Sequence, residues 1–463
     1  MCETLNSNER SLSRTLGRVL MAGGLIFACV SASPSFSQPS SGKEQYDTTV
    51  AYLEQFYPLW FTYNQSHGTP NRMVGPDRIS PLYQTVVAIN VDTLYASAFL
   101  DLTAQPVVLT VPSTQVTYSV LVLDSYGNIV DTPVSTTAPG VYEFVGPGYT
   151  GAPVAGVTPV APKLNHMIVI FRADKYSSTN QEQIRQAEQF RKSLLMQTLS
   201  NWQTNPTGGA ATILPELHYA APFKTAADAM IAKQPVKFLQ ELQKAVAAPN
   251  TPPLSTDQQA LSDAFNRLFA QGGDMSQFAV GAQAAHTAIL QNYLTHTDKN
   301  NWIDFANIGT WAADRSGALD RSSITEYIQY GNNFQAAAYY QAFNDVTGAS
   351  LNGSAPGGYV LKFAKPDIPQ AKRFWSLTAY TPQSIELIRN DARQYHIASY
   401  SPGLKYNPDG SVSIYMAKKR PMGVPVANWL PVAAGPFNVM LRVCGPEGIV
   451  AKGDYVSPGI VKR

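Results

Sequence analysis

The sequence lacks most of the short motifs that reveal a reaction. It contains no G-x-S-x-G, G-x-x-x-x-G-K-[ST] or H-E-x-x-H pattern, which excludes the nucleophile elbow, the phosphate-binding loop and the helical zinc motif. It has three cysteines and no C-x-x-C pair, so a tetrahedral thiolate zinc site is excluded as well. The six histidines include no close pair at metal-ligand spacing. A site assembled from distant histidines stays open.

Charge is also scarce, and neither sign dominates. Charged residues make up 14% of the 463 positions, and 34 Lys and Arg against 32 Asp and Glu give a net charge of +2. Such a balance does not attract nucleic acid or an anionic membrane over long range, so no nucleic-acid partner is expected. The 44% of hydrophobic residues excludes a disordered chain. The length is enough for two or three packed units.

The first 37 residues are predicted to be a signal peptide. Three arginines precede the apolar run Val19–Val30, and a small-x-small sequence ends at Ser37. A run of twelve residues is too short to span a membrane, which takes about 20. We therefore expect export to the periplasm or the medium, with no integral membrane segment after processing.

Cys29 gives an alternative to cleavage after Ser37, because a Cys after an apolar run can be lipidated in bacterial lipoproteins. The bulky Phe27 near it argues against this. If cleavage follows Ser37, Cys2 and Cys29 leave with the leader. Cys444 would then be the one remaining thiol, expected as a small buried hydrophobic residue.

The predicted fold class is α+β, mainly β, with two antiparallel jelly-roll-like β-sandwiches joined by a helical section. The proposed boundaries are 43–175 and 346–463 for the sandwiches and 181–345 for the helices. Both sandwich regions have short β-branched or aromatic runs between Pro, Gly, Asn and Asp. The predicted strands are Val107–Val111, Tyr118–Leu123, Met167–Phe171, Tyr359–Phe363, Phe374–Tyr380, Val412–Met416 and Phe437–Val443.

Helices are predicted from apolar periodicity and capping residues. Ser255 with Gln258 forms a capping-box sequence before an apolar stripe that a glycine pair ends. Residues 183–202 and 276–295 show similar periodicity. An aromatic helix over residues 43–63 is also predicted, and Pro58 is expected to end or kink it.

The densest polar cluster in an apolar setting runs from Asn90 to Tyr95. Alternation places Asn90 and Asp92 on one face of a strand, and a buried Asp needs hydrogen-bond donors. In one interpretation these residues stabilise a turn or bulge. In the other, Asp92 is a general base with Tyr95 as a donor and Asn90 as a substrate ligand, and Asp92→Asn would abolish turnover without changing the thermal midpoint.

A second cluster, Asp124-Ser125-Tyr126-Gly127-Asn128, follows an apolar strand. Turn chemistry is the first interpretation, because Asp, Ser and Asn side chains bond their own backbone. Loops at strand ends also hold sites. Tyr126 is therefore a candidate catalytic donor and Asn128 a candidate substrate ligand.

The C-terminal region has a strand whose one face is polar and aromatic. Along Phe374–Tyr380, Tyr380 shares a face with Ser376, while Trp375 lies on the other face; Trp375 and Tyr380 are candidate binding residues. Arg442 is a lone cation in an alternating apolar strand. It needs a buried carboxylate partner or a ligand, and a structural ion pair is the first expectation.

Two sets of strings resemble a known pair of domain families. Asn90–Tyr95, with Leu100-Asp101-Leu102 and Pro106–Leu109, resembles the signature of domain of unknown function 1254. Phe374–Tyr380, Asp409-Gly410-Ser411 and Asn428–Pro431 resemble domain of unknown function 1214. The resemblance implies tandem jelly-roll-type sandwiches joined by helices, often exported from bacteria. It implies no activity, cofactor or catalytic residue.

Three functions follow as hypotheses. The first is an exported enzyme acting on a small or polymeric substrate in a cavity between the sandwiches. The second is a non-catalytic envelope protein that binds a carbohydrate or an apolar ligand, with aromatic side chains as platforms. The third is a structural protein that forms homo-oligomers. No metal ligand is assigned, and the cofactor is left open.

Overall fold

The computed structural model describes residues 41–82, 86–152, 154–176, 180–216, 218–219, 221–272 and 274–463. The predicted signal peptide at residues 1–37, including Cys29, lies outside these ranges. Within them, no helix combines the length and the apolar character that crossing a bilayer requires.

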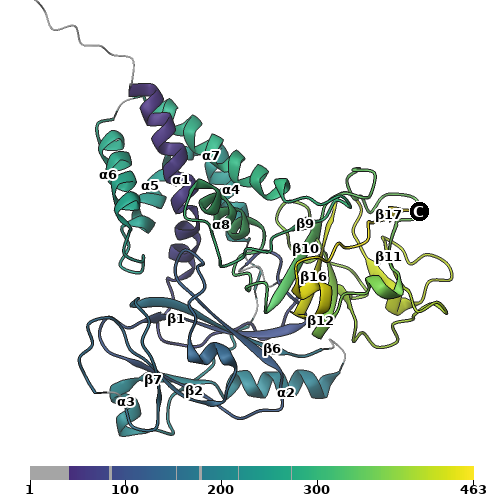
Figure 1. Ribbon diagram of the computed structural model, residues 1–463, viewed down its shortest axis with the longest axis horizontal. Coiled ribbons are helices and arrows are strands. Elements are labelled where there is room, and N and C mark those ends of the chain that lie inside the picture. The colour runs from purple at the N-terminus through teal and green to yellow at the C-terminus, as the bar shows by residue number, and fades with distance from the viewer. Residues whose placement is uncertain are drawn as a thin grey trace, which may run out of the picture. The chain divides into compact units, whose positions relative to one another are not determined.

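The N-terminal sandwich consists of two sheets, which we call sheet A and sheet B (Figure 1). Sheet A has the order β1 (Thr93–Asp101), β6 (His166–Asp174), β3 (Tyr118–Leu123), all antiparallel. Sheet B has the order β5 (Thr158–Val160), β4 (Gly140–Phe144), β2 (Val107–Val111), β7 (Leu195–Thr198), β8 (Ala210–Ala211). Alternate residues such as Ala96 of β1 and Leu109 of β2 face each other in a shared core. The side chains on the other face of sheet A point away from this core, so this face can contact another part of the chain.

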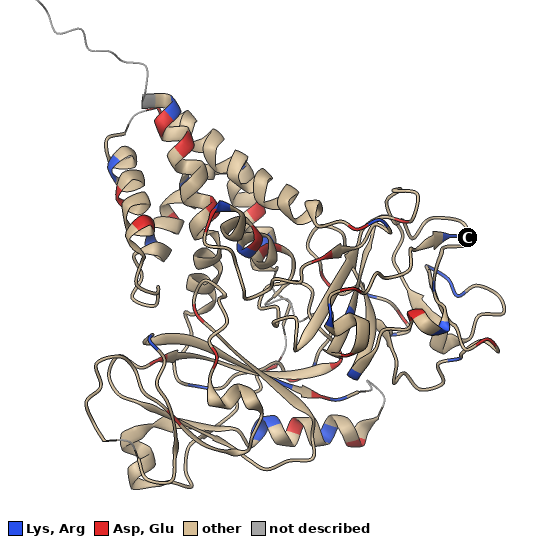
Figure 2. Cartoon of the chain, in the orientation of Figure 1, with Lys and Arg blue, Asp and Glu red and all other residues tan. Residues whose placement is uncertain are grey.

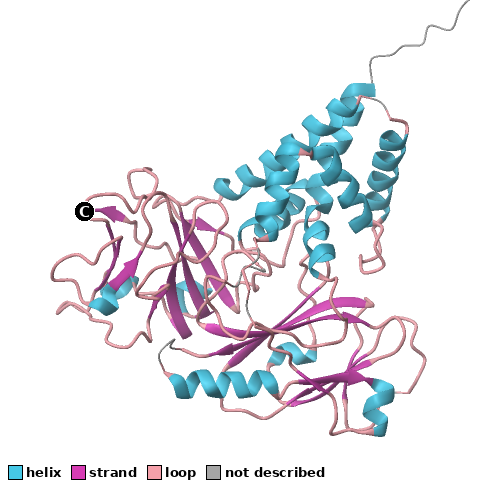
Figure 3. Cartoon of the chain, turned by 180° about the vertical axis from the view of Figure 1, so that it is seen from behind, coloured by secondary structure: helices cyan, strands magenta, loops and turns pink. Residues whose placement is uncertain are grey.

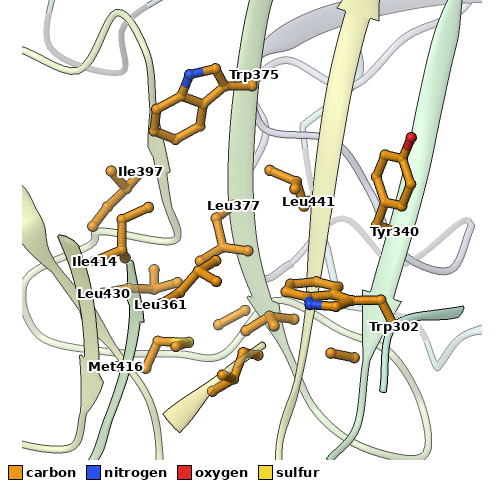
Figure 4. Packing of buried hydrophobic residues seen from close by; sticks show 14 of the residues in the cluster. Trp302, Tyr340, Leu361, Trp375, Leu377, Ile397, Ile414, Met416, Leu430 and Leu441 are labelled. Atoms are coloured by element: carbon orange, nitrogen blue, oxygen red, sulfur yellow. The ribbon is translucent and has the colours of Figure 1, made fainter. Parts of the chain in front are cut away.

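The C-terminal sandwich also consists of two sheets, which we call sheet C and sheet D. Sheet C has the order β13 (His396–Ala398), β12 (Ala371–Tyr380), β16 (Asn438–Pro446), β10 (Ala337–Ala342), β9 (Ile303–Asp304). Sheet D has the order β15 (Trp429–Pro431), β14 (Val412–Ala417), β11 (Tyr359–Phe363), β17 (Val461–Lys462). Figure 4 shows Leu377 and Leu441 of sheet C against Leu361 and Ile414 of sheet D. The opposite face of sheet C carries Ser376 and Arg442.

Apart from α2, the long helices gather into a third layer (Figure 3). The long helices are α1 (Ser41–Gln65), α2 (Gln181–Lys192), α4 (Phe223–Lys233), α5 (Pro235–Val246), α6 (Thr256–Ala270), α7 (Met275–Thr295) and α8 (Arg315–Tyr327). Short ones are α3 (Leu199–Thr204) and α9 (Gly448–Ala451). Helix α2 packs on sheet A and has both signs of charge interspersed along it (Figure 2). The predicted capping box is confirmed, since Ser255 and Gln258 bond reciprocally at the start of α6.

Helix α1 does not end at Pro58. Proline removes the N–H that would bind the carbonyl of Glu54, four residues earlier. That carbonyl accepts a hydrogen bond from the Ser322 hydroxyl of α8 at 2.8 Å. Because a neighbouring helix satisfies the freed acceptor, α1 continues through Pro58 to Gln65.

The α+β class with a sandwich at each end is confirmed. Helices hold 31% of the described residues and strands 24%. Strands therefore predominate only in the two sandwich regions. The jelly-roll strand order and the domain boundaries stay predictions. Helix α1 packs with α5 to α8, while β7 and β10, from the section predicted as helical, complete sheets B and C. The single helix predicted over 183–202 is wrong, because α2 ends at Lys192 and β7 pairs with β2.

Candidate functional site

A cavity lies where the outer face of sheet A meets the outer face of sheet C. Strands β1, β3 and β6 form one wall, and β10, β12 and β16 form the other. The segments 86–90 and 328–336 close the sides. Its empty volume, counted to the open mouth, is about 1020 Å³.

The walls are mainly aliphatic and aromatic. The apolar lining residues include Val86, Ile89, Phe99, Ile168, Ile170 and Ile328. Tyr95 and Tyr339 add aromatic rings with hydroxyl groups, and Asn90 adds an amide. No Asp, Glu, His or Lys lines the cavity in the described part of the chain. Its ionisable groups are therefore arginines, tyrosines and one thiol.

Arg442 of β16 reaches the cavity from sheet C and is 3% exposed. Its Nη1 donates to the Tyr380 hydroxyl at 2.8 Å, and its Nη2 donates to the Ala88 carbonyl. The guanidinium also lies 6.0 Å from the ring centre of Tyr339. Within the described ranges no carboxylate is at ion-pair distance, so the expected structural ion pair is wrong. Burial alone would lower the pKa of Arg442, but the surrounding tyrosine oxygens raise it.

Arg172 of β6 reaches the same cavity from sheet A and is 8% exposed. Its Nη1 donates to Asn332 Oδ1 at 2.7 Å, and its Nη2 donates to the Tyr330 carbonyl at 2.7 Å. It lies 5.7 Å from the ring centre of Tyr95. It too has no ion pair with a described carboxylate. Sequence reasoning missed it, although Arg172 is also a lone cation in an apolar strand.

Both carbonyls that these arginines bind belong to residues with left-handed backbone. Ala88 has a φ of 51° and Tyr330 a φ of 61°. A non-glycine residue in this region costs about 1 kcal/mol or more, and such strain gathers at ligand sites. The backbone is thus held in an unfavourable conformation on each side of the cavity.

The junction of the sandwiches has an excess of positive charge. Six largely buried side chains there carry a charge in their usual states: Asp92, Asp174, Arg172, Lys175, Arg373 and Arg442. Arg373 is neutralised by Asp174, with Nε 2.9 Å from Oδ2. Burial raises the pKa of Asp174 to about 6, although Arg373 acts against this. In their usual charge states four cations face two carboxylates, an excess of two positive charges.

Asp92 lies immediately before β1 and is fully buried, and it does not line the cavity. Its carboxylate accepts hydrogen bonds from the hydroxyls of Ser376, at 2.6 Å, and Tyr400. His396 Nε2 lies 3.3 Å from Oδ1. Burial lowers the pKa of His396, with Asp92 acting in the opposite direction. Asp92 therefore connects the N-terminal sandwich to the C-terminal one.

The other predicted site residues fall into three places. Asn90 and Tyr95 line the cavity. The Tyr380 hydroxyl accepts a hydrogen bond from Arg442 and donates one to the Ile89 carbonyl at 2.7 Å. Trp375 lies inside the core of the C-terminal sandwich (Figure 4) and does not line the cavity.

Tyr126 and Asn128 lie apart from the cavity. Asp124 accepts hydrogen bonds from the backbone N–H of both residues, at 2.8 and 2.9 Å, as the turn interpretation expects. Tyr126 is 3% exposed in the core of the helical layer. The guanidinium of Arg321 lies 4.7 Å from its ring centre.

A separate polar cluster lies among the helices. Asp228, His286 and Glu326 have ligand atoms within 4.8 Å of one another, so these residues could hold a metal ion. Lys224 Nζ contacts Glu326 and lies 2.8 Å from Asp228. Burial acts to lower the pKa of His286, but the nearby carboxylates of Asp228 and Glu326, 3.2 and 3.9 Å from its Nε2, outweigh this and raise the pKa to about 9. Two cations and two carboxylates therefore already balance.

Comparisons with known proteins find family models and solved structures to which the chain is similar. The family model described as protein of unknown function DUF1254 matches residues 70–198, and the one described as DUF1214 matches residues 336–448. The crystal structure of the VPA0106 protein from Vibrio parahaemolyticus is similar, with a TM-score of 0.57 and 19% identity over 90% of this chain and 100% of that one. An uncharacterized protein from Burkholderia cenocepacia gives a TM-score of 0.43 and 13% identity over 91% and 95%. No curated protein matches.

Proposed function

The chain belongs to the family of proteins in which a DUF1254 domain precedes a DUF1214 domain, and since neither description assigns an activity, we propose a function from the cavity itself. The protein binds a small, mostly apolar organic molecule between its two sandwiches. The observation that carries this proposal is a cavity between the two sandwiches whose walls are mainly aliphatic and aromatic. A pocket of this kind is the usual form of a small-molecule site.

Binding is better supported than catalysis by the groups that face the cavity. General acid–base catalysis needs a group whose pKa lies near the working pH. Burial raises the pKa of the Cys444 thiol to about 12 and raises the pKa of Tyr339. At neutral pH both groups stay protonated. Asp92, the base proposed in the enzyme hypothesis, has its carboxylate bonded to two hydroxyls outside the cavity wall.

The proposal predicts that filling the cavity abolishes ligand binding. Ser97 is a small residue of β1 that lines the cavity. It pairs with Ile170 on the adjacent strand β6. In a thermal-shift screen of small organic molecules, a ligand at a hundredfold excess over its Kd should stabilise the wild type by about 2.7 kcal/mol. Ser97→Trp should remove this stabilisation, because the indole occupies the space.

Thr110→Trp is the matched control. Thr110 is a half-buried residue of β2, in sheet B, and does not line the cavity. This variant should respond to ligand as the wild type does. A screen without any stabilising compound, or a ligand that Ser97→Trp still binds, would contradict the proposal.

We further propose that binding takes place after export. The support is the arginine-preceded apolar run Val19–Val30 and the small-x-small sequence that ends at Ser37. Protein purified from the envelope fraction of a bacterial host should have a mass that corresponds to a chain beginning at Gln38. A chain that starts at Met1, found with the cytoplasmic fraction, would contradict export. A lipid-modified Cys29 would contradict this cleavage site.

A further inference from the structure

We infer that the ligand of this cavity is a carboxylic acid, whose carboxylate is bound by Arg442 and Arg172 from opposite sheets. This inference rests on the proposed function, because it names the chemical class of the molecule that the cavity takes. Arg442 comes from sheet C and Arg172 from sheet A, and both line the cavity.

The two guanidinium groups lack the partners that buried cations normally have. Removing a cation from water costs several kcal/mol unless an opposite charge and hydrogen bonds replace the water. Arg442 and Arg172 are 3% and 8% exposed. Their hydrogen bonds go to neutral oxygens, of Tyr380 and Ala88 for one and of Asn332 and Tyr330 for the other.

Each guanidinium also has donors left over. Arginine has five N–H groups in a planar fork that fits a carboxylate. The hydrogen bonds above use two of the five on Arg442 and two on Arg172. Cation–π contacts with tyrosine rings compensate part of the charge. An anionic ligand would use the remaining donors and reduce the positive excess at the junction.

Shared neighbours place the two arginines at one region of the cavity. The Tyr339 hydroxyl accepts hydrogen bonds from Asn332 N and Nδ2, both at 3.0 Å. Asn332 Oδ1 in turn accepts from Arg172, while Arg442 lies 6.0 Å from the Tyr339 ring centre. One polar chain therefore runs from Arg172 through Asn332 to Tyr339, beside Arg442.

The cavity wall offers the apolar body of the ligand a hydrophobic surface next to Arg172. Ile170 and Ile168 follow Arg172 on the same face of β6, and both line the cavity. At about 3.4 Å per strand residue, Ile168 lies on the order of 14 Å along the strand from Arg172. The arrangement fits an acid with an extended or aromatic apolar body.

Calorimetric titration of the full chain tests the carboxylate. The probes are decanoate and 3-phenylpropanoate, each compared with the corresponding alcohol, decanol and 3-phenylpropanol. At least one acid should bind more tightly than its alcohol, because only the acid pairs with the arginines. Arg442→Met should weaken acid binding roughly 10- to 100-fold, the value of hydrogen bonds to a charged group. It should weaken binding of the alcohol much less than binding of the acid.

Two further variants keep the test decisive. Arg172→Met removes the second cation, which comes from the other sheet, and should weaken acid binding to the same extent. It provides the test if Arg442→Met does not fold. Arg185→Met is the control, since Arg185 lies on the exposed side of α2 and pairs with Glu182. It should bind every probe as the wild type does.

The possible results separate this inference from the proposed function. Equal affinity for acid and alcohol, or acid binding that neither arginine variant weakens, would overturn the carboxylate and leave a cavity for neutral molecules. Binding of neither class, together with a screened neutral ligand that Ser97→Trp blocks, would overturn it too. If the screen yields no ligand at all, the proposed function fails as well.

Discussion

Replacing Glu326 by Gln is expected to lower the free energy of unfolding by about 3–5 kcal/mol, the cost of breaking a buried ion pair. Glu326 of α8 is fully buried and contacts Lys224 of α4. It also accepts a hydrogen bond from the hydroxyl of Tyr57 in α1. His286 Nε2 of α7 lies 3.9 Å from its Oε1. The positive charges of Lys224 and His286 hold the pKa of Glu326 well below its usual range despite burial. Without the carboxylate, two cations would be left under-compensated among four helices. Chemical denaturation measures the loss.

Two variants show whether the loss comes from unpaired charge. Glu188→Gln breaks an exposed pair with Lys192 on α2, where N and O lie 3.5 Å apart, and should cost less than about 1 kcal/mol. Adding Lys224→Met to Glu326→Gln removes one uncompensated cation and should recover part of the stability. A loss no larger than that of Glu188→Gln would show that the cluster does not hold the helices together.

The pH dependence of stability gives an independent check on the same cluster. His286 has an ordinary pKa of 6.5, which the folded protein raises to about 9. A raised folded-state pKa stabilises the protein fully below pH 6.5, and this contribution is lost as the pH rises through about 9. In Glu326→Gln the loss should be smaller, because one of the two carboxylates that raise the pKa is gone. Denaturation curves at pH 6 and pH 10 would show the difference.

Local sequence pattern predicted much of the secondary structure. The bounds of β2, β3 and β11 agree with the prediction, because each strand is a short β-branched or aromatic run between turn residues. The capping box of α6 was also readable from two residues. These features depend on contacts within a few residues, so the sequence is sufficient for them.

Features that depend on distant partners were not predictable in this way. Strand β7 continues a helical pattern, but it is a strand because β2 pairs with it across almost ninety residues. Helix α1 passes Pro58 because Ser322 satisfies Glu54. Nothing near Pro58 in the sequence indicates that donor.

The candidate site shows the same division. The lone cation in an apolar strand singled out Arg442, and the same signal was present for Arg172. Their acceptors include the carbonyls of Ala88 and Tyr330, and the residue types at these two positions do not predict a left-handed backbone. Trp375 and Tyr380 were placed on opposite faces of β12 by alternation, but only the structure shows which face meets sheet A.

Replacing Asp92 by Asn is expected to destabilise the protein by about 2–4 kcal/mol, since hydrogen bonds to a charged group contribute about 1.5–3 kcal/mol each. The carboxylate is fully buried and accepts hydrogen bonds from the hydroxyls of Ser376 and Tyr400, which belong to the C-terminal sandwich. An amide has one acceptor oxygen in place of two, so one hydroxyl would meet an N–H group instead. The junction would also lose one of its two carboxylates. This outcome reverses the sequence-based expectation of an unchanged thermal midpoint.

The single variants Ser376→Ala and Tyr400→Phe separate the two bonds. Each removes one hydroxyl and leaves the carboxylate, so each should cost less than Asp92→Asn. Cavity binding should survive in all three variants wherever they remain folded, because Asp92, Ser376 and Tyr400 do not line the cavity. An unchanged midpoint in Asp92→Asn together with lost ligand binding would instead place Asp92 in the site. Loss of stability with retained binding would establish it as the buried link through which the N-terminal sandwich is fixed to the C-terminal one, and so as a condition for the cavity between them.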